Sequence, residues 1–184
     1  MSEILATDPD VIISHGQTAD YIGLGDALRA ANFDGMYLIP AADPALAGIV
    51  GPSYGITQWG PPETASSVPA IKQMVDDLEA FKPGTKAGTL TTLGWLAADH
   101  FIEAVKKTGK NLTAERLQKV ASKMTYEREG FIGPTPYPKA WSDAGAPACH
   151  AIVKTDGSSY TVVEPYQCST KKWRATSYDE EATG

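Results

Sequence analysis

The chain has few cysteines, no excess of basic residues and no long apolar run. Its 184 residues include two cysteines and three histidines, and 16 basic side chains against 22 acidic ones give a formal net charge of −6. So acidic a chain offers no positive field to a phosphate backbone, and nucleic acid is not expected as a partner. No apolar run reaches the roughly 18–20 residues that span a bilayer, so no membrane-spanning segment is expected.

The sequence also lacks the motifs of several enzyme classes and carries no export signal. It has no Gly-x-Ser-x-Gly elbow, no zinc-binding pattern, no dinucleotide fingerprint and no phosphate-binding loop. We therefore predict no metal, no cofactor and no catalytic residues. The missing leader leaves two interpretations: a cytoplasmic protein, or an exported one whose leader has been removed.

What the sequence does contain is a regular alternation of apolar strands and amphipathic helices. Its 42% hydrophobic and 21% charged residues are typical of a globular protein. Residues 10–14 and 36–40 are typical of buried strands, and residues 19–32 between them have the period of a helix. The apolar face of this helix would consist of Tyr21, Leu24, Leu28 and Ala31. The pattern predicts a right-handed βαβ unit with parallel strands, whose ligands gather at the C-terminal strand ends.

The rest of the chain is predicted to be mainly helical and then β-structured. Further helices are expected over residues 45–49, from 67 to a stop at 82–84, over 92–107, and from an N-cap at Thr113 to about Lys123. Residues 51–62 are rich in proline and glycine and indicate either a brief strand or a crossing loop. Late β-structure is expected at residues 131–135 and in a hairpin at 148–165.

The two cysteines flank this hairpin. Asp156 and Gly157 lie between two alternating apolar runs, which is a strong signal for a tight turn. If the strands pair about that turn, Cys149 and Cys168 lie near the same end and could form a disulfide. They could equally be two unrelated buried thiols.

The candidate site lies in the two turns that follow the strands of the βαβ unit. Its residues are His15, Gly16, Gln17, Thr18, Tyr21, Ala42 and Asp43. Turn polar groups and helix N-terminal N–H groups of this kind can bind a small polar solute without breaking a bond. The sequence therefore favours a binding module over an enzyme.

Individual residues of this set allow more than one role. His15 could cap the following helix, contact a ligand or act as a general base, although no partner for the last role is identifiable. Tyr21 could contact a ligand or belong to the core, because it lies on the apolar helix face. The other histidines, His100 and His150, are expected to be structural.

The order of these segments resembles a known family. Residues 9–13, 28–31 and 35–39 look like the second-lobe βαβ unit of the branched-chain amino-acid binding proteins of ABC transporters, which are type I periplasmic binding proteins. The later segments that are similar, in the family's order, are residues 94–105, 113–123, 131–137 and 150–165. The resemblance covers nearly all of residues 7–168. Members of the family have two lobes and about twice this length, so the chain would be the C-terminal half of such a protein.

The resemblance implies a fold and a division of the chain. The fold would be an α/β lobe with a three-layer, parallel-sheet arrangement, incomplete, with a late β-hairpin. Residues 4–66 would form the βαβ part of the second ligand-binding lobe, and residues 67–127 a helical segment of the first lobe. Residues 128–168 would supply the closing strands and hairpin, and residues 169–184 a polar tail.

The resemblance also implies a function and a site. The full-length protein would be an extracytoplasmic solute-binding protein that delivers branched-chain amino acids, or related small amino acids and amides, to a membrane permease. Its second-lobe contacts would come from His15, Gln17 and Tyr21 and from Ala42 and Asp43, with the Asp43 carboxylate facing the ligand's ammonium group.

Two properties of the chain as given follow from the same resemblance. A disulfide between Cys149 and Cys168 is expected, consistent with an exported protein. The exposed sheet edges and apolar faces of a half protein are expected to drive self-association. Two other functions stay open: a ligand-sensing regulatory lobe of the same fold, and a small α/β hydrolase or lyase that uses His15 and Asp43.

Overall fold

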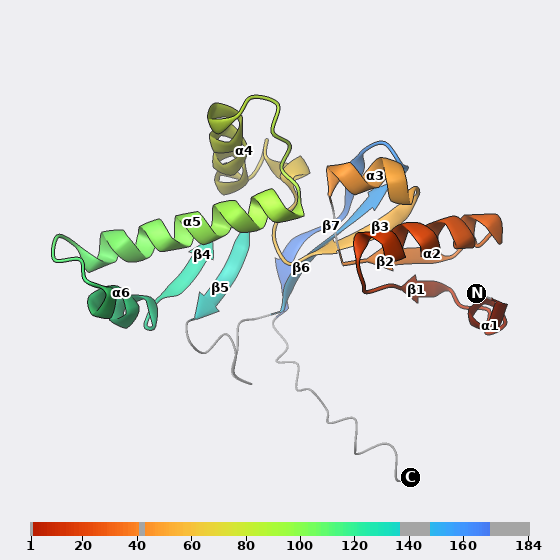
Figure 1. Ribbon diagram of the computed structural model, residues 1–184, viewed down its shortest axis with the longest axis horizontal. Coiled ribbons are helices and arrows are strands. Elements are labelled where there is room, and N and C mark those ends of the chain that lie inside the picture. The colour runs from red at the N-terminus through yellow and green to blue at the C-terminus, as the bar shows by residue number, and fades with distance from the viewer. Residues whose placement is uncertain (1, 41–42, 137–147, 170–184) are drawn as a thin grey trace, which may run out of the picture.

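The computed structural model describes residues 2–40, 43–136 and 148–169, and within them the chain forms two sheets (Figure 1). The larger sheet has the strand order β1-β2-β3-β6-β7 and the smaller one pairs β4 with β5. The larger sheet contains β1 (Val11–Ile13), β2 (Met36–Ile39), β3 (Ser53–Thr57), β6 (Cys149–Thr155) and β7 (Tyr160–Cys168). The smaller one contains β4 (Thr125–Arg128) and β5 (Ile132–Pro136).

The first three strands form the predicted βαβ arrangement. β1, β2 and β3 are parallel, whereas β6 runs antiparallel to β3, and β7 antiparallel to β6. A short helix, α1 (Ser2–Leu5), precedes β1, and α2 (Thr18–Ala30) and α3 (Pro44–Val50) pack on one face of the sheet. The core on this face contains Ile12, Tyr21, Leu28, Tyr37, Ile39 and Val50. We call this unit, with β6 and β7, the five-stranded body.

The opposite face of the five-stranded body is more open. Because side chains alternate along a strand, Val11 and Ile13 point away from the core that holds Ile12. Val11 is 45% exposed and Ile13 is 71% exposed. Exposed β-branched residues on an edge strand are a typical site for association with further polypeptide.

The remaining elements form a second unit, which we call the helical body (Figure 1). It is built from α4 (Pro69–Phe81), α5 (Thr89–Thr108), α6 (Ala114–Ala121) and the small sheet. Its core contains Ile71, Met74 and Phe131, all fully buried, with Trp95 packed against them. The segment that leaves β3 and carries the short 3-10 helix η1 (Pro62–Thr64) connects the two bodies.

The predicted fold class, an α/β arrangement with a mainly parallel sheet and a late β-hairpin, is confirmed, and most element bounds agree within a few residues. Ile71 and Met74, which lie at helical spacing in α4, are buried, and Thr113 caps α6 by accepting the Arg116 N–H. The 51–62 stretch contains a brief strand, β3, and α5 begins three residues earlier than predicted. The strand β4 was not predicted. In the described ranges, no helix is long and apolar enough to cross a membrane.

The predicted hairpin is present, and a disulfide closes its open end. Cys149 pairs with Cys168 in the β6–β7 register, and their sulfurs are bonded. Of the two interpretations that the residues left open, the bridged one is therefore correct. The two histidines that were expected to be structural both lie against neighbouring side chains. His100 stacks near the Tyr126 ring, with 4.8 Å between centroids, and His150 lies 3.6 Å from a Glu164 carboxylate oxygen.

Candidate functional site

The turn after β1 is held by hydrogen bonds to the first turn of α2. The Ser14 N–H donates to the Leu38 carbonyl and extends the pairing of β1 with β2 to the C-terminal edge of the sheet. The Gly16 N–H donates to the Tyr21 hydroxyl oxygen at 3.2 Å. The Gln17 N–H donates to the Asp20 carboxylate at 2.7 Å, which places a negative charge at the positive end of the helix.

The residues predicted in this turn occupy two different environments. Tyr21 is only 7% exposed and its ring is part of the core, while its backbone carbonyl accepts the Tyr37 hydroxyl at 3.0 Å. Its main contacts are therefore with the core and the turn backbone. His15, Gln17 and Thr18 are exposed at the sheet edge, and Gly16 is half-buried.

The turn after β2 leads to Asp43, which starts α3 and reaches across to the helical body. The Asp43 carbonyl accepts the Leu46 and Ala47 N–H groups of the first turn of α3. Its carboxylate oxygen Oδ2 accepts the Thr89 N–H at 3.2 Å, at the N-terminus of α5. Asp43 is therefore positioned by both bodies. Ala42, the other residue predicted in this turn, lies outside the described residues.

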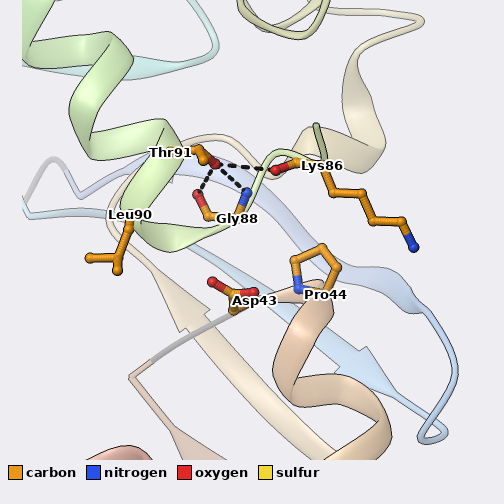
Figure 2. Close-up of a pocket in the computed structure, with 6 residues that line it drawn as sticks. All are labelled: Asp43, Pro44, Lys86, Gly88, Leu90 and Thr91. Carbon is orange, nitrogen blue, oxygen red and sulfur yellow. Dashed lines mark hydrogen bonds between the residues drawn. The ribbon is translucent and has the colours of Figure 1, made fainter. Parts of the chain in front are cut away.

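The N-terminus of α5 is built to accept this carboxylate. The Gly88 N–H donates to the Thr91 hydroxyl oxygen at 2.7 Å, which satisfies one of the free donors of the helix end (Figure 2). A Cβ atom added at Gly88 would lie 2.7 Å from Asp43 Oδ2, closer than any side chain tolerates. Glycine at this position therefore permits the approach. The negative carboxylate also complements the helix dipole.

Between these segments lies an open pocket of about 250 Å³, at the junction of the two bodies (Figure 2). Its lining residues are Asp43, Pro44, Lys86, Gly88, Leu90 and Thr91. The lining combines one carboxylate, one ammonium group, one hydroxyl, backbone polar groups and the apolar side chains of Pro44 and Leu90. Such a set can hold a small polar solute with an apolar part by hydrogen bonds and burial.

Of the residues predicted from the sequence, the structure brings Asp43 into this pocket. The contribution of the α5 N-terminus, with Lys86, Gly88 and Thr91, was not predicted. The only local signal for it is a glycine followed by three threonines within four residues, a pattern that is typical of helix N-termini. This local pattern does not predict which turn of the chain packs against the helix N-terminus.

Two acidic groups of the five-stranded body and the connecting segment have raised pKa values. Burial raises the pKa of Tyr160 to about 12, with Asp43 and Glu63 contributing further in the same direction by their charges. Burial also raises the pKa of the Glu63 carboxyl. In the part of the chain that the structure describes, no group of three or more His, Cys, Asp and Glu side chains could hold a metal ion.

Residues 1–159 match the model of a family described as periplasmic binding protein. The search of curated proteins finds no match. Among solved structures, the chain is similar to a leucine-binding protein from Thermotoga maritima, with 20% identity and a TM-score of 0.68. That match covers 90% of this chain and 46% of the other.

Two further solved structures are similar to the chain over about half of their own length. A branched-chain amino-acid ABC transporter protein from Thermus thermophilus, with bound valine, is 16% identical with a TM-score of 0.66, covering 92% of this chain and 48% of that one. A solute-binding protein from R. palustris, in complex with benzoate, is also 16% identical, with a TM-score of 0.65 and coverage of 92% and 47%. The chain therefore spans just under half the length of these structures, and at such identities the similarity concerns the fold.

Proposed function

Because this chain belongs to the periplasmic binding protein family, we propose that it forms the C-terminal half of an extracytoplasmic solute-binding protein for ABC-type uptake. The full-length protein would be located outside the cytoplasm and deliver its solute to a membrane permease. The ligand would be a branched-chain amino acid or a related small amino acid or amide. The family assignment supports binding rather than catalysis. The similar structures of a leucine-binding protein and of a branched-chain amino-acid transporter protein with bound valine support the ligand class.

The observation that carries the proposal is the pocket at the junction of the two bodies. In this proposal the five-stranded body (residues 4–66 with the hairpin) is the second lobe, and residues 67–127 belong to the first lobe. The pocket lies at the C-terminal edge of the parallel strands, where α/β sheets bind their ligands. Asp43 would accept the ligand's ammonium group, and the exposed side chains of the β1 turn, including His15 and Gln17, would line the approach.

We expect the chain to bind L-leucine or L-valine weakly, because only part of the pocket is present. Asp43→Asn should weaken this binding about tenfold or more, since it replaces a charge-assisted hydrogen bond by a neutral one. Saturation-transfer NMR on the full chain measures the binding. Asp34→Asn, an exposed aspartate in the turn before β2, is the matched control and should change nothing. Equal binding by both variants, or no transfer to either amino acid, would contradict the proposal.

We also propose that the chain self-associates through the open face of the five-stranded body. Ile13, 71% exposed on the edge strand β1, would be buried in the contact. We expect an oligomer by multi-angle light scattering, and Ile13→Lys should shift it toward the monomer. Leu112→Lys, a similar change at a 50% exposed leucine outside this sheet, is the control. A monodisperse monomer of the unchanged chain would contradict this proposal.

A further inference from the structure

The disulfide does more than close the hairpin, because the helical body packs directly against it. Cys149 and Cys168 stand opposite each other at the start of β6 and the end of β7. Gly133, in β5 of the small sheet, lies against both sulfurs. A Cβ atom added at Gly133 would lie 2.7 Å from the Cys168 sulfur and closer still to that of Cys149. Any side chain at this position would therefore separate β5 from the disulfide.

A hydrogen bond joins the two bodies at the same point. The Gly133 N–H donates to the Tyr166 hydroxyl oxygen at 2.6 Å, from β5 to β7. Tyr166 and Gly133 are 33 residues apart in sequence, so this hydrogen bond is a tertiary contact and not part of a local turn. Gly133 is therefore in contact with both the Tyr166 hydroxyl and the disulfide.

The connecting segment after β3 meets the start of β5 nearby. The Gly60 N–H donates to the Phe131 carbonyl at 2.7 Å, and a Cβ atom at Gly60 would lie 2.7 Å from Ile71 Cδ1. β3 and β6 are antiparallel, and Thr57 at the end of β3 pairs with Ala151 near the start of β6. The sheet edge that follows the ends of β1, β2 and β3 is therefore also the edge that carries the disulfide.

We propose that the Cys149–Cys168 disulfide, Tyr166 and Gly133 form a clamp that fixes the angle between the five-stranded body and the helical body. The clamp lies on the β6–β7 side of the sheet edge, and the contact of Asp43 with Thr89 lies on the β2 side, with the connecting segment between them. A change of angle at the clamp changes the width of the pocket at Asp43. Reduction by a dithiol, which gives two cysteine thiols and oxidises the dithiol to its own disulfide, loosens the clamp.

Hydrogen exchange of the full, oxidised chain, followed by mass spectrometry of peptides, tests the clamp. Tyr166→Phe removes the acceptor of the Gly133 N–H and leaves the disulfide intact. We expect about fivefold faster exchange in β5 and in residues 57–62, with the β6–β7 hairpin unchanged. Tyr54→Phe removes a hydroxyl from β3, opposite Lys154 and far along β6 from the disulfide, and should leave all of these peptides unchanged.

Two further measurements distinguish this clamp from a disulfide that stabilises only the β6–β7 hairpin. Dithiothreitol should raise exchange in β5 and residues 57–62 as well as in the hairpin. Gly133→Ala should increase the radius of gyration in small-angle scattering, because the new methyl group displaces β5 from the sulfurs. If Gly133→Ala fails to fold, Tyr166→Phe still decides. Faster exchange confined to the hairpin after reduction, or no change in β5 with Tyr166→Phe, would overturn the proposal.

Discussion

Phe131→Ala is expected to lower the free energy of unfolding by about 3–5 kcal/mol, the usual cost of removing a buried phenylalanine. Phe131 is fully buried immediately before β5, and its ring centroid lies 5.8 Å from that of Trp95. Its neighbours Ile71 and Met74 are also fully buried, so the space cannot be filled by side chains moving in from the surface. The result is a cavity in the middle of the helical body.

The measurement is urea unfolding followed by circular dichroism, with Phe101→Ala as the control. Phe101 is the same residue type on α5 but is 58% exposed, so its loss should change the free energy of unfolding by less than about 0.5 kcal/mol. Similar losses for the two variants would mean that the helical body has no independent packed core at Phe131.

Local periodicity accounts for the parts of the fold that were predicted correctly. The spacing of Ile71 and Met74 follows the helical period, and both residues are buried on the face that the pattern indicated. The same holds for Tyr21 and Leu28 in α2. These elements are encoded by their own residues, because an amphipathic face needs only an apolar surface to pack against.

The strand β4 was missed because its stabilisation is not local. The segment Thr125–Arg128 has one hydroxyl, one aromatic, one acidic and one basic side chain. It is too short and too polar to give a strand pattern. The strand exists because it pairs with β5 and because Tyr126 and Arg128 both bond to Asp99 on α5. Asp99 is 27 residues from Tyr126 in sequence, so the residues of the strand do not predict this contact.

The candidate site was predicted in part, for a similar reason. The position of Asp43 after a buried strand follows from the βαβ rule and needs no tertiary information. Its partner at Thr89 is 46 residues away in sequence, on the other body. The pocket wall formed by the α5 N-terminus therefore depends on how the two bodies meet, which no local pattern specifies. The same is true of the contact between Gly133 and the disulfide.

Asp99→Ala is expected to lower the free energy of unfolding by about 2–4 kcal/mol, because it removes the acceptor of three hydrogen bonds at once. Arg128 donates through Nε and Nη2 to the two Asp99 oxygens at 2.7 and 2.8 Å. The Tyr126 hydroxyl donates to Asp99 Oδ2 at 2.7 Å. Burial and the Asp99 charge both raise the pKa of Tyr126, so its hydroxyl remains a donor at neutral pH.

The size of the loss depends on what replaces the carboxylate. The Arg128 side chain is 32% exposed and lies 3.5 Å from a Glu103 oxygen, so water and Glu103 compensate part of its lost pairing. Tyr126 is only 6% exposed, so water cannot readily replace the lost acceptor of its hydroxyl. This unpaired hydroxyl therefore accounts for much of the lost free energy of unfolding. Adding Tyr126→Phe to Asp99→Ala should therefore recover part of the loss, because the donor left without its acceptor is then removed.

A double-mutant cycle in urea unfolding measures this coupling, with Asp76→Ala as the control. Asp76 pairs with Lys72 on the exposed face of α4, and its removal should cost no more than about 0.5 kcal/mol. Additive losses for Asp99 and Tyr126 would contradict a shared hydrogen-bond network. Strong coupling would mean that β4 is held to α5 by its polar side chains, and that the helix forming one wall of the pocket is fixed through Asp99 as well as through the apolar core.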